Sequence, residues 1–574
     1  MKKLKTTLTK LGFGIILIFI YSNIIHAQTG NTLLGTGAGN SITTGDSIVA
    51  IGTGAGHSNA IGSRHIFIGT NAGYNTNANP NTILGDNNRG VSGTPYDSPN
   101  LFIGHYAGYH TTSLENLFIG HQSGYRNTLG IDNVFLGNQT GINNTTGSDN
   151  TFIGLRAGAT NTTGYDNTFM GEEAGYHNTT GHDNIFIGED AGFDNTTGNR
   201  NTFVGTSAGR QNETGYRNAF FGQEAGYDNT TGHHNTCIGD SAGLDNSTGI
   251  YNTFIGAGCG TATEWTSYNT FVGVYAGSDN NRTNQTTGAA RNTYMGVYAG
   301  FTNREGSDNT GLGCLADFVA GAGGSTSTNG TSTNISNTVF LGAYASVAAN
   351  GVVILGKSSL GSGDNGIAIG HQSSVTADNA IAIGYQTTAT NANEINIGNA
   401  AHTSIGGPLN WTATSDGRFK TDVKENVVGL NFINQLRPVT YQFDSEKLME
   451  QQGCMPEDLW NVLLAKNEIR YTGFIAQEVE TAAQNVNFNF SGIDKPTQKT
   501  TDNGEQITDY YGLRYAEFVV PLVKATQELA QKVETLEQEN AAQKQLLAKY
   551  EAALESALQR LENVEQTNLP LAEQ

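Results

Sequence analysis

The sequence is poor in charged residues, above all in basic ones, and in cysteine. Only 14% of its 574 residues are charged, and 30 Lys and Arg face 51 Asp and Glu, for a formal net charge of −21. Nucleic-acid binding needs clustered Lys and Arg to neutralise phosphates, so nucleic acid is excluded as a main partner. The 4 cysteines are scattered without a CxxC pair, which argues against a disulfide framework and a zinc site. Stability must come from elsewhere.

Charge and glycine are unevenly distributed along the chain. Residues 415–574 contain 40 charged residues among 160 and 7 glycines, whereas residues 28–414 contain 37 charged residues among 387 and 66 glycines. A change of this size indicates that two kinds of structure join near residue 415.

The first residues have the pattern of an export signal. Lys2 and Lys3 precede an apolar run that ends near Ile25, and Ala27 occupies a plausible cleavage position. The alternative, a membrane anchor, needs roughly 20 apolar residues, and this run is shorter. We therefore expect residues 1–27 to be a signal peptide, with the mature chain exported to the cell surface or beyond and holding no transmembrane segment.

Residues 28–323 repeat Asn-Thr-Phe-Ile-Gly, or a close variant, followed by a Gly-punctuated bend and an Asn-Thr-Thr-Gly turn. A 17-residue period is too short for a helical repeat and suits one coil of a parallel β-roll. Glycine would serve tight corners, and the recurring Asn could form a ladder along the stack. A disordered spacer is the alternative, which the regular apolar pairs disfavour. The regular copies begin at Asn116, Asn133, Asn150, Asn167, Asn184, Asn201, Asn218, Asn235, Asn252 and Asn269.

An apolar pair in each coil predicts that the rods associate. Phe186 and Ile187 are adjacent, so in a strand they face opposite sides. One can fill the narrow interior of the coil. The other would form an apolar strip too large to leave in water unless another chain covers it. The simplest such bundle is a homotrimer.

A low-complexity insert at 324–336 separates this array from a shorter repeat over 337–414. The second repeat carries Ile-Ala-Ile-Gly at Ile367 and Ile381. Residues 352–398 resemble the head repeats of trimeric autotransporter adhesins, a resemblance that implies trimeric β-rolls.

Two polar patterns in the repeats have other possible interpretations. The Asn-Thr-Thr triplets match N-glycosylation sequons, but their regular placement favours turn chemistry. Acidic pairs such as Glu172-Glu173 and Glu189-Asp190 do not recur in every coil and lack a loop of oxygen ligands. We interpret them as solvated charge rather than a calcium site or a glycosidase pair, and we expect no metal and no cofactor.

The segment after residue 415 contains four motif blocks in a fixed order. They resemble the intramolecular chaperone domain of the endosialidase and phage tail-spike type over residues 415–525. The resemblance implies a domain that trimerises, assists folding of the preceding fibre and cuts itself off with a Ser/Lys pair, here Ser415 and Lys420. Asp416 and Arg418 belong to the first block without an assigned role. The blocks cover residues 415–423, 429–441, 473–480 and 513–523.

The chemistry of such a pair can be argued from the residues. A Ser hydroxyl becomes a useful nucleophile when a base takes its proton, and a neutral Lys amine can do so. Burial, or a nearby positive charge such as Arg418, favours the neutral amine. Attack by Ser415 on the carbonyl of Thr414 passes through a five-membered ring, which favours cleavage between these two residues. Attack from another subunit would allow cleavage before Asp416, and an ordinary interdomain linker is the alternative without chemistry.

A heptad pattern follows over residues 526–566, before a tail at 567–574. Sustained over five heptads, it predicts a coiled coil that would hold three chains in register. A single amphipathic helix packed on its own domain is the alternative. One heptad position holds Thr526, Val533, Asn540, Leu547, Leu554 and Leu561, and the other holds Leu522, Leu529, Leu536, Gln543 and Tyr550.

The predicted fold class is mainly β: a trimeric parallel β-roll rod, then a small α+β domain and a coiled coil. The predicted function is that of an exported trimeric fibre or adhesin with a single-turnover, self-cleaving serine peptidase domain. A surface glycan or a cell-surface receptor is its expected outside partner. A glycan-binding or glycan-degrading spike, and a stalk that is not cleaved, stay open as alternatives.

Overall fold

The chain divides into two compact units, Met1–Asn399 and Ala400–Gln574. The predicted signal peptide and most of the 324–336 insert and of the 567–574 tail lie outside the residues that this computed structural model describes. The described residues are 30–59, 63–74, 82–85, 99–281, 288–318, 335–399, 401–402, 404–406, 413–445, 447, 467–496, 498–500, 506–508 and 510–567.

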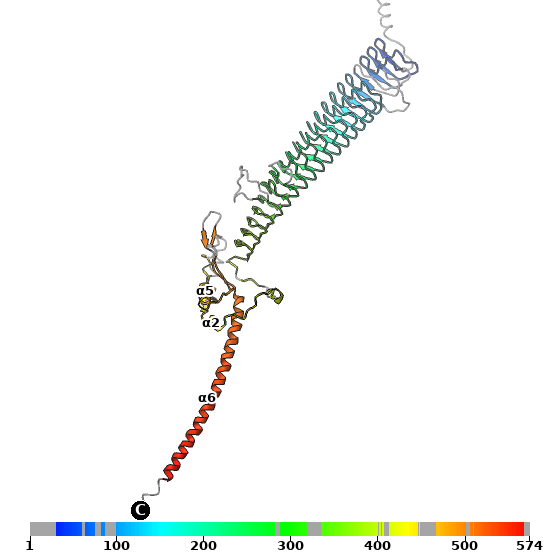
Figure 1. Cartoon of the computed structure of the whole chain (residues 1–574). Coiled ribbons are helices and arrows are strands. Elements are labelled where there is room, and N and C mark those ends of the chain that lie inside the picture. The colour runs from blue at the N-terminus through cyan, green and yellow to red at the C-terminus, as the bar shows by residue number, and fades with distance from the viewer. Residues whose placement is uncertain are drawn as a thin grey trace, which may run out of the picture. The chain divides into compact units, whose positions relative to one another are not determined.

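The first unit is a parallel β-solenoid, drawn from blue to yellow-green in Figure 1. Its main sheet has 22 strands, and each pairs in parallel with the strand of the next coil. The register is regular, so that Phe186 lies opposite Phe203. With strands about 4.8 Å apart, the sheet extends on the order of 100 Å. The predicted parallel β-roll is confirmed.

The strands of the main sheet each cover three residues. They are β1 (Thr32–Leu34), β2 (Val49–Ile51), β3 (Ile66–Ile68), β4 (Thr82–Leu84), β5 (Leu101–Ile103), β6 (Leu117–Ile119), β7 (Val134–Leu136), β8 (Thr151–Ile153), β9 (Thr168–Met170), β10 (Ile185–Ile187), β11 (Thr202–Val204), β12 (Ala219–Phe221), β13 (Thr236–Ile238), β14 (Thr253–Ile255), β15 (Thr270–Val272), β16 (Thr293–Met295), β17 (Thr310–Leu312), β19 (Val339–Leu341), β21 (Val353–Leu355), β23 (Ile367–Ile369), β25 (Ile381–Ile383) and β27 (Ile395–Ile397).

A column of stacked phenyl rings forms the solenoid core. The Phe152 and Phe169 ring centroids are 4.7 Å apart, with planes tilted by only 3°. Burial of each such side chain contributes roughly 2–3 kcal/mol. The strand positions on either side point outward: Ile185 is 41% exposed and Ile187 37% exposed, while Phe186 is fully buried. As predicted, Phe186 of the apolar pair fills the interior of the coil, whereas Ile187 faces solvent in the single chain.

The corners of each coil use positive φ, but glycine supplies only some of them. Gly192 has φ of 60°, and a Cβ there would lie 2.6 Å from the Phe186 ring. Asp190 and Arg200 of the same coil also have positive φ, 57° in each case. The sequence indicated glycine corners and gave no sign of these additional left-handed positions, which cost side-chain-bearing residues roughly 1–2 kcal/mol each.

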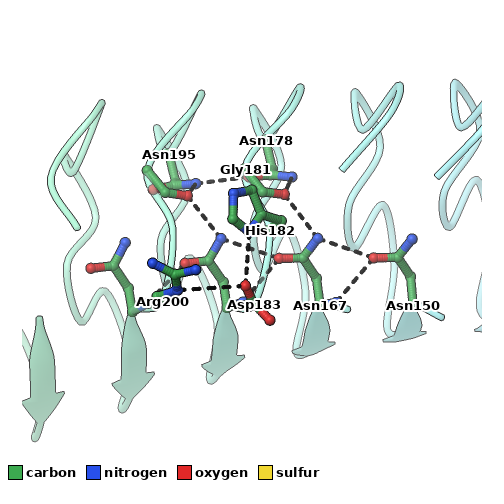
Figure 2. A network of polar contacts seen from close by, with 11 residues as sticks. Asn150, Asn167, Asn178, Gly181, His182, Asp183, Asn195 and Arg200 are labelled. Carbon is green, nitrogen blue, oxygen red and sulfur yellow. Dashed lines mark hydrogen bonds and ion pairs between the residues drawn. The ribbon is translucent and has the colours of Figure 1, made fainter. Parts of the chain in front are cut away.

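Two asparagine ladders, rather than the single ladder expected, run along the solenoid (Figure 2). In the first, Asn167 Nδ2 donates to Asn150 Oδ1 at 3.0 Å and to the Gly181 carbonyl at 2.9 Å. In the second, Asn195 Nδ2 donates to Asn178 Oδ1 at 2.7 Å. The second ladder consists of the Asn of the Asn-Thr-Thr turns, and its side chains are fully buried. This burial supports the interpretation as turn chemistry over glycosylation.

The later coils are shorter and gain a second wall. From β21 onward, strands of the main sheet recur every 14 residues, as in the pairing of Ile367 with Ile381. A second parallel sheet runs alongside, with β18 (Asp317–Phe318), β20 (Ser346–Val347), β22 (Leu360–Gly361), β24 (Ser374–Val375) and β26 (Thr388–Ala389).

The second unit is a small α+β assembly followed by a long helix. Its core packs Phe432, Val479, Phe490 and Phe518 together. Its elements are η1 (Gly417–Phe419), α2 (Leu430–Ile433), β28 (Val439–Tyr441), β29 (Tyr471–Gly473), α5 (Ala476–Asn485), β30 (Ile493–Asp494), β31 (Gln498–Thr500), β32 (Gln506–Thr508), β33 (Gly512–Leu513), η3 (Tyr515–Phe518) and α6 (Val519–Thr567).

Helix α6, red in Figure 1, leaves the core of its unit early. Pro521 and Ala525 are its buried residues. The apolar heptad positions beyond them are exposed: Leu529 by 52%, Leu547 by 58% and Leu561 by 61%. The alternative of a helix packed on its own domain is therefore wrong for this part of α6. No helix within the described ranges is long and apolar enough to cross a membrane.

Candidate functional site

The residues of the first motif block form one tight turn. Asp416 has an extended backbone and caps the 3₁₀ turn η1, and Lys420 ends it. Phe419 N donates to the Asp416 carbonyl at 3.1 Å, and Lys420 N donates to the Gly417 carbonyl at 3.2 Å. The chain therefore turns back on itself between Ser415 and Lys420.

This turn brings the two predicted catalytic side chains together. Lys420 Nζ donates to Ser415 Oγ at 2.8 Å, within the range expected of a nucleophile and its base. Both residues are exposed, and a Cβ added at Gly417 would meet nothing within 4 Å. An amine must be neutral to take the hydroxyl proton, and burial favours that form. In the single chain the pair is positioned but open to water.

Asp416 and Arg418 pair with each other across the turn. Arg418 N donates to Asp416 Oδ1 at 2.9 Å, and the guanidinium Nε and Nη2 donate to Oδ2 at 3.0 and 2.6 Å. These bonds hold the pKa of the Asp416 carboxyl below its usual range and raise the pKa of Arg418. The charge of Arg418 is thus offset by Asp416, so that Arg418 contributes less positive potential near Lys420 than an unpaired arginine would.

The two bonds considered for cleavage lie just before the turn. Thr414 and Ser415 are exposed in irregular backbone, and Asp416 is half-buried at the turn. Both the Thr414–Ser415 and the Ser415–Asp416 peptide bonds are therefore accessible. The positions of the described residues favour neither bond as the cleavage site.

The other three motif blocks meet in the core of the second unit. Arg437 Nε donates to Glu478 Oε2 at 3.0 Å, joining the second block to the third. Phe474 N donates to the Tyr515 hydroxyl at 3.0 Å, joining the third to the fourth. Leu430 N donates to Glu528 Oε2 at 2.8 Å, tying the second block to α6. The first block, by contrast, has no buried residue in its turn.

The acidic pairs of the solenoid take part in surface ion pairs. Glu173 pairs with Arg156, and Asp190 pairs with Arg210 at 3.3 Å. Within the described part of the chain, no cluster of three or more His, Cys, Asp or Glu side chains could hold a metal ion.

A shallow depression of about 380 Å³ on the outside of the solenoid is lined by polar residues, although most of the surface that it exposes is apolar. Its walls come from equivalent positions of successive coils, including Thr160, His177 and Asp194. His177 Nε2 lies 3.9 Å from Asp194 Oδ1. This arrangement lacks a nucleophile and base in contact and suits contact with a polar ligand better than catalysis.

The fold and the turn together define a class of protein: a repetitive parallel β-solenoid, followed by a small α+β unit that starts with a Ser/Lys contact. Residues 415–487 match the peptidase S74 family model, described as chaperone of endosialidase, and residues 362–387 match two copies of the YadA head domain repeat. Both predicted resemblances are confirmed, in the predicted order. The first match ends at 487, short of the expected 525. No curated protein matches the chain.

Proposed function

We propose that this chain is a surface or extracellular homotrimeric fibre whose C-terminal unit assists its assembly and then cuts itself off. The 2.8 Å contact between Lys420 Nζ and Ser415 Oγ carries the proposal. The family matches support it, because a chaperone-type segment follows adhesin-head repeats along one chain. The proposed boundaries are a rod up to residue 414, an assembly unit over 415–525 and a coiled coil over 526–566.

Cleavage would proceed as an acyl transfer within the chain. Neutral Lys420 takes the proton of the Ser415 hydroxyl, and Oγ attacks the Thr414 carbonyl carbon. The Thr414–Ser415 C–N bond breaks and the Ser415 nitrogen leaves as an amine with that proton, which gives an ester on Ser415 Oγ. Water then hydrolyses the ester and frees the Thr414 carboxylate. Attack by the Ser415 of another copy would instead cut before Asp416.

The apolar surfaces of the single chain support the trimer. One strip runs along the main sheet at the third strand position, as at Ile187, Phe221 and Ile255. Another runs along α6 at Leu529, Leu547 and Leu561. Apolar strips of this length rarely stay in water. A trimeric coiled coil would bring three rods together and raise their local concentration, so that the slow long-range β-pairing starts in register.

The decisive experiment compares the mature chain with Ser415→Ala and Lys420→Ala variants on denaturing gels and by mass spectrometry. We expect the wild type to release a fragment that starts at Ser415, whereas both variants stay intact. Lys424→Ala is the matched control, since it removes an exposed lysine that contacts Asp422 at 2.7 Å just beyond the turn. An intact wild-type chain, or a Ser415→Ala chain that is still cut, would disprove self-cleavage.

The depression beside His177 supports a second candidate for the outward role, that of glycan contact. A glycan array probed with the released rod tests it. Binding that is lost on His177→Ala would favour an adhesin, whereas an array without signal would favour an inert stalk.

A further inference from the structure

The turn that joins Ser415 to Lys420 is not buried among the described residues of its unit. It contains three residues, none of them buried. The Lys420 side chain has a flexible four-carbon stem, and fixing such a stem costs up to about 2 kcal/mol of rotamer entropy. A contact of 2.8 Å between its Nζ and Ser415 Oγ therefore needs a local device that fixes the path of the backbone.

The hydrogen bonds of the turn identify that device. The Asp416 carboxylate accepts three of them, from the backbone N and from two guanidinium nitrogens of Arg418. The first is an N-cap bond, which satisfies a donor that a 3₁₀ turn cannot satisfy internally. The guanidinium bonds, made edge-on to one carboxylate oxygen, hold that carboxylate in the capping position.

We propose that Asp416 and Arg418 are positioning residues of the Ser/Lys pair. Asp416 caps the turn, Arg418 holds Asp416 in place, and the capped turn directs Lys420 Nζ onto Ser415 Oγ. Neither residue exchanges a proton with the reacting atoms. This inference rests on the proposed self-cleavage and gives Asp416 and Arg418 a role beside Ser415 and Lys420 in the first block.

The test follows cleavage in time by pulse-chase in a cell-free translation of the full chain, with trimer formation monitored on native gels. We expect Asp416→Ala to slow cleavage by about tenfold, in line with the loss of one N-cap. Asp416→Asn keeps a capping oxygen and should stay within about threefold of the wild type. Arg418→Ala should fall between them, and the Lys424→Ala control should cleave at the wild-type rate.

A pH series separates positioning from proton transfer. If Asp416 only positions the turn, the Asp416→Asn rate keeps the pH dependence of the wild type and is lowered uniformly. A shifted pH profile, equal slowing by Asn and Ala, or normal cleavage by Asp416→Ala would each overturn the inference.

Two further outcomes keep the test decisive. If Asp416→Ala fails to trimerise, the Asp416→Ser variant replaces it in the test, because a serine hydroxyl can cap the turn without carrying a charge. We expect the Asp416→Ser trimer to cleave. A normal Asp416→Ser trimer that does not cleave would overturn the inference. Wild-type cleavage that is abolished by Ser415→Ala but unaffected by Asp416→Ala refutes only the positioning role. Wild-type chains that never cleave refute the proposed function itself.

Discussion

Asp317 shows how a single titratable residue can set the pH response of the rod. It lies in β18 beside the buried Tyr294, and it accepts hydrogen bonds from Thr302 N at 3.0 Å and Thr302 Oγ1 at 3.2 Å. Burial raises its pKa to about 7, against the opposing effect of these bonds. The folded chain therefore binds a proton that the unfolded chain has released above about pH 4.

The sign of this linkage gives a prediction. A raised folded-state pKa means that the contribution of Asp317 to stability is fully present at acidic pH and is lost as the pH rises from about 4 to 7. Asp317→Asn should remove this loss and stabilise the rod at pH 8 by on the order of 2 kcal/mol, with little effect near pH 4. The measurement is the urea midpoint at both pH values.

Asp308→Asn is the opposite control. Its carboxylate pairs with Arg291 at 2.6 Å, which lowers the pKa of Asp308. The Asn variant should leave the midpoint at pH 8 unchanged or slightly lower, since exposed pairs contribute little. A midpoint for Asp317→Asn that tracks the wild type at both pH values would contradict the role given to Asp317.

At the level of residues, the sequence singled out Ser415 and Lys420, which the structure brings into contact, but not the bonds around them. The two residues could be singled out because their motif block resembles a known family and because a hydroxyl and an amine can form a nucleophile and base. The roles of Asp416 and Arg418 could not, because they depend on where the backbone between them turns. Likewise, Asp317 is one of many aspartates in the sequence. Its burial could not be predicted, because it depends on how the folded coil encloses this residue.

Among the strands of the solenoid, β13 interrupts the column of stacked phenyl rings. Cys237 replaces a ring between Phe220 and Phe254. In the next coil Cys259 occupies a position at which neighbouring coils carry alanine. Both cysteines are fully buried, and burial raises the pKa of the Cys259 thiol to about 12. We infer that the Cys259 side chain, which is larger than alanine, restores part of the volume that the missing ring at Cys237 removes, and its Sγ also donates to the Phe271 carbonyl at 3.3 Å.

This compensation predicts a non-additive pair of substitutions. Cys237→Phe together with Cys259→Ala restores the regular column and should stabilise the rod by about 1–2 kcal/mol. Cys259→Ala alone enlarges the gap and should destabilise by about 1 kcal/mol, and Cys237→Phe alone should gain less than the double variant. Urea midpoints of the four proteins form a double-mutant cycle. Additive effects would show that the two sites are independent.

Elements were predictable where a pattern repeats. The strands follow from apolar pairs at a 17-residue spacing, and α6 follows from its heptads. The second asparagine ladder was missed although its residues were visible in nearly every regular copy, Thr263 being the exception. A turn motif and a buried ladder have the same sequence signature, and only the stacking of coils buries Asn178 against Asn195.

For the whole molecule, we expect the proposed assembly to depend on α6. Removing residues 526–574 should abolish trimer formation, because it deletes the exposed apolar heptads of the helix. Light scattering on the Ser415→Ala background, where cleavage cannot confuse the masses, should then report a monomer or irregular aggregates. The same background with α6 intact is the control and should give a trimer. A trimer without α6 would place the assembly determinant in the solenoid or the small unit.

That the chain has two kinds of structure was predictable from composition, since charge and glycine both change near residue 415, whereas the two compact units divide between Asn399 and Ala400. The association of the chains was predictable only as a need to cover apolar surface, because a single chain shows the strips but not the arrangement of the chains that cover them.

The two longest intervals between paired strands bear on how such a rod can diversify. The chain takes 23 residues to pass from β15 to β16 and 29 from β17 to β19, yet the strands still pair in register, Thr270 with Thr293 and Thr310 with Val339. Extra sequence between two coils is thus compatible with unbroken strand pairing. The solenoid is a scaffold in which the length of a connection can change while the spacing of the strands is kept.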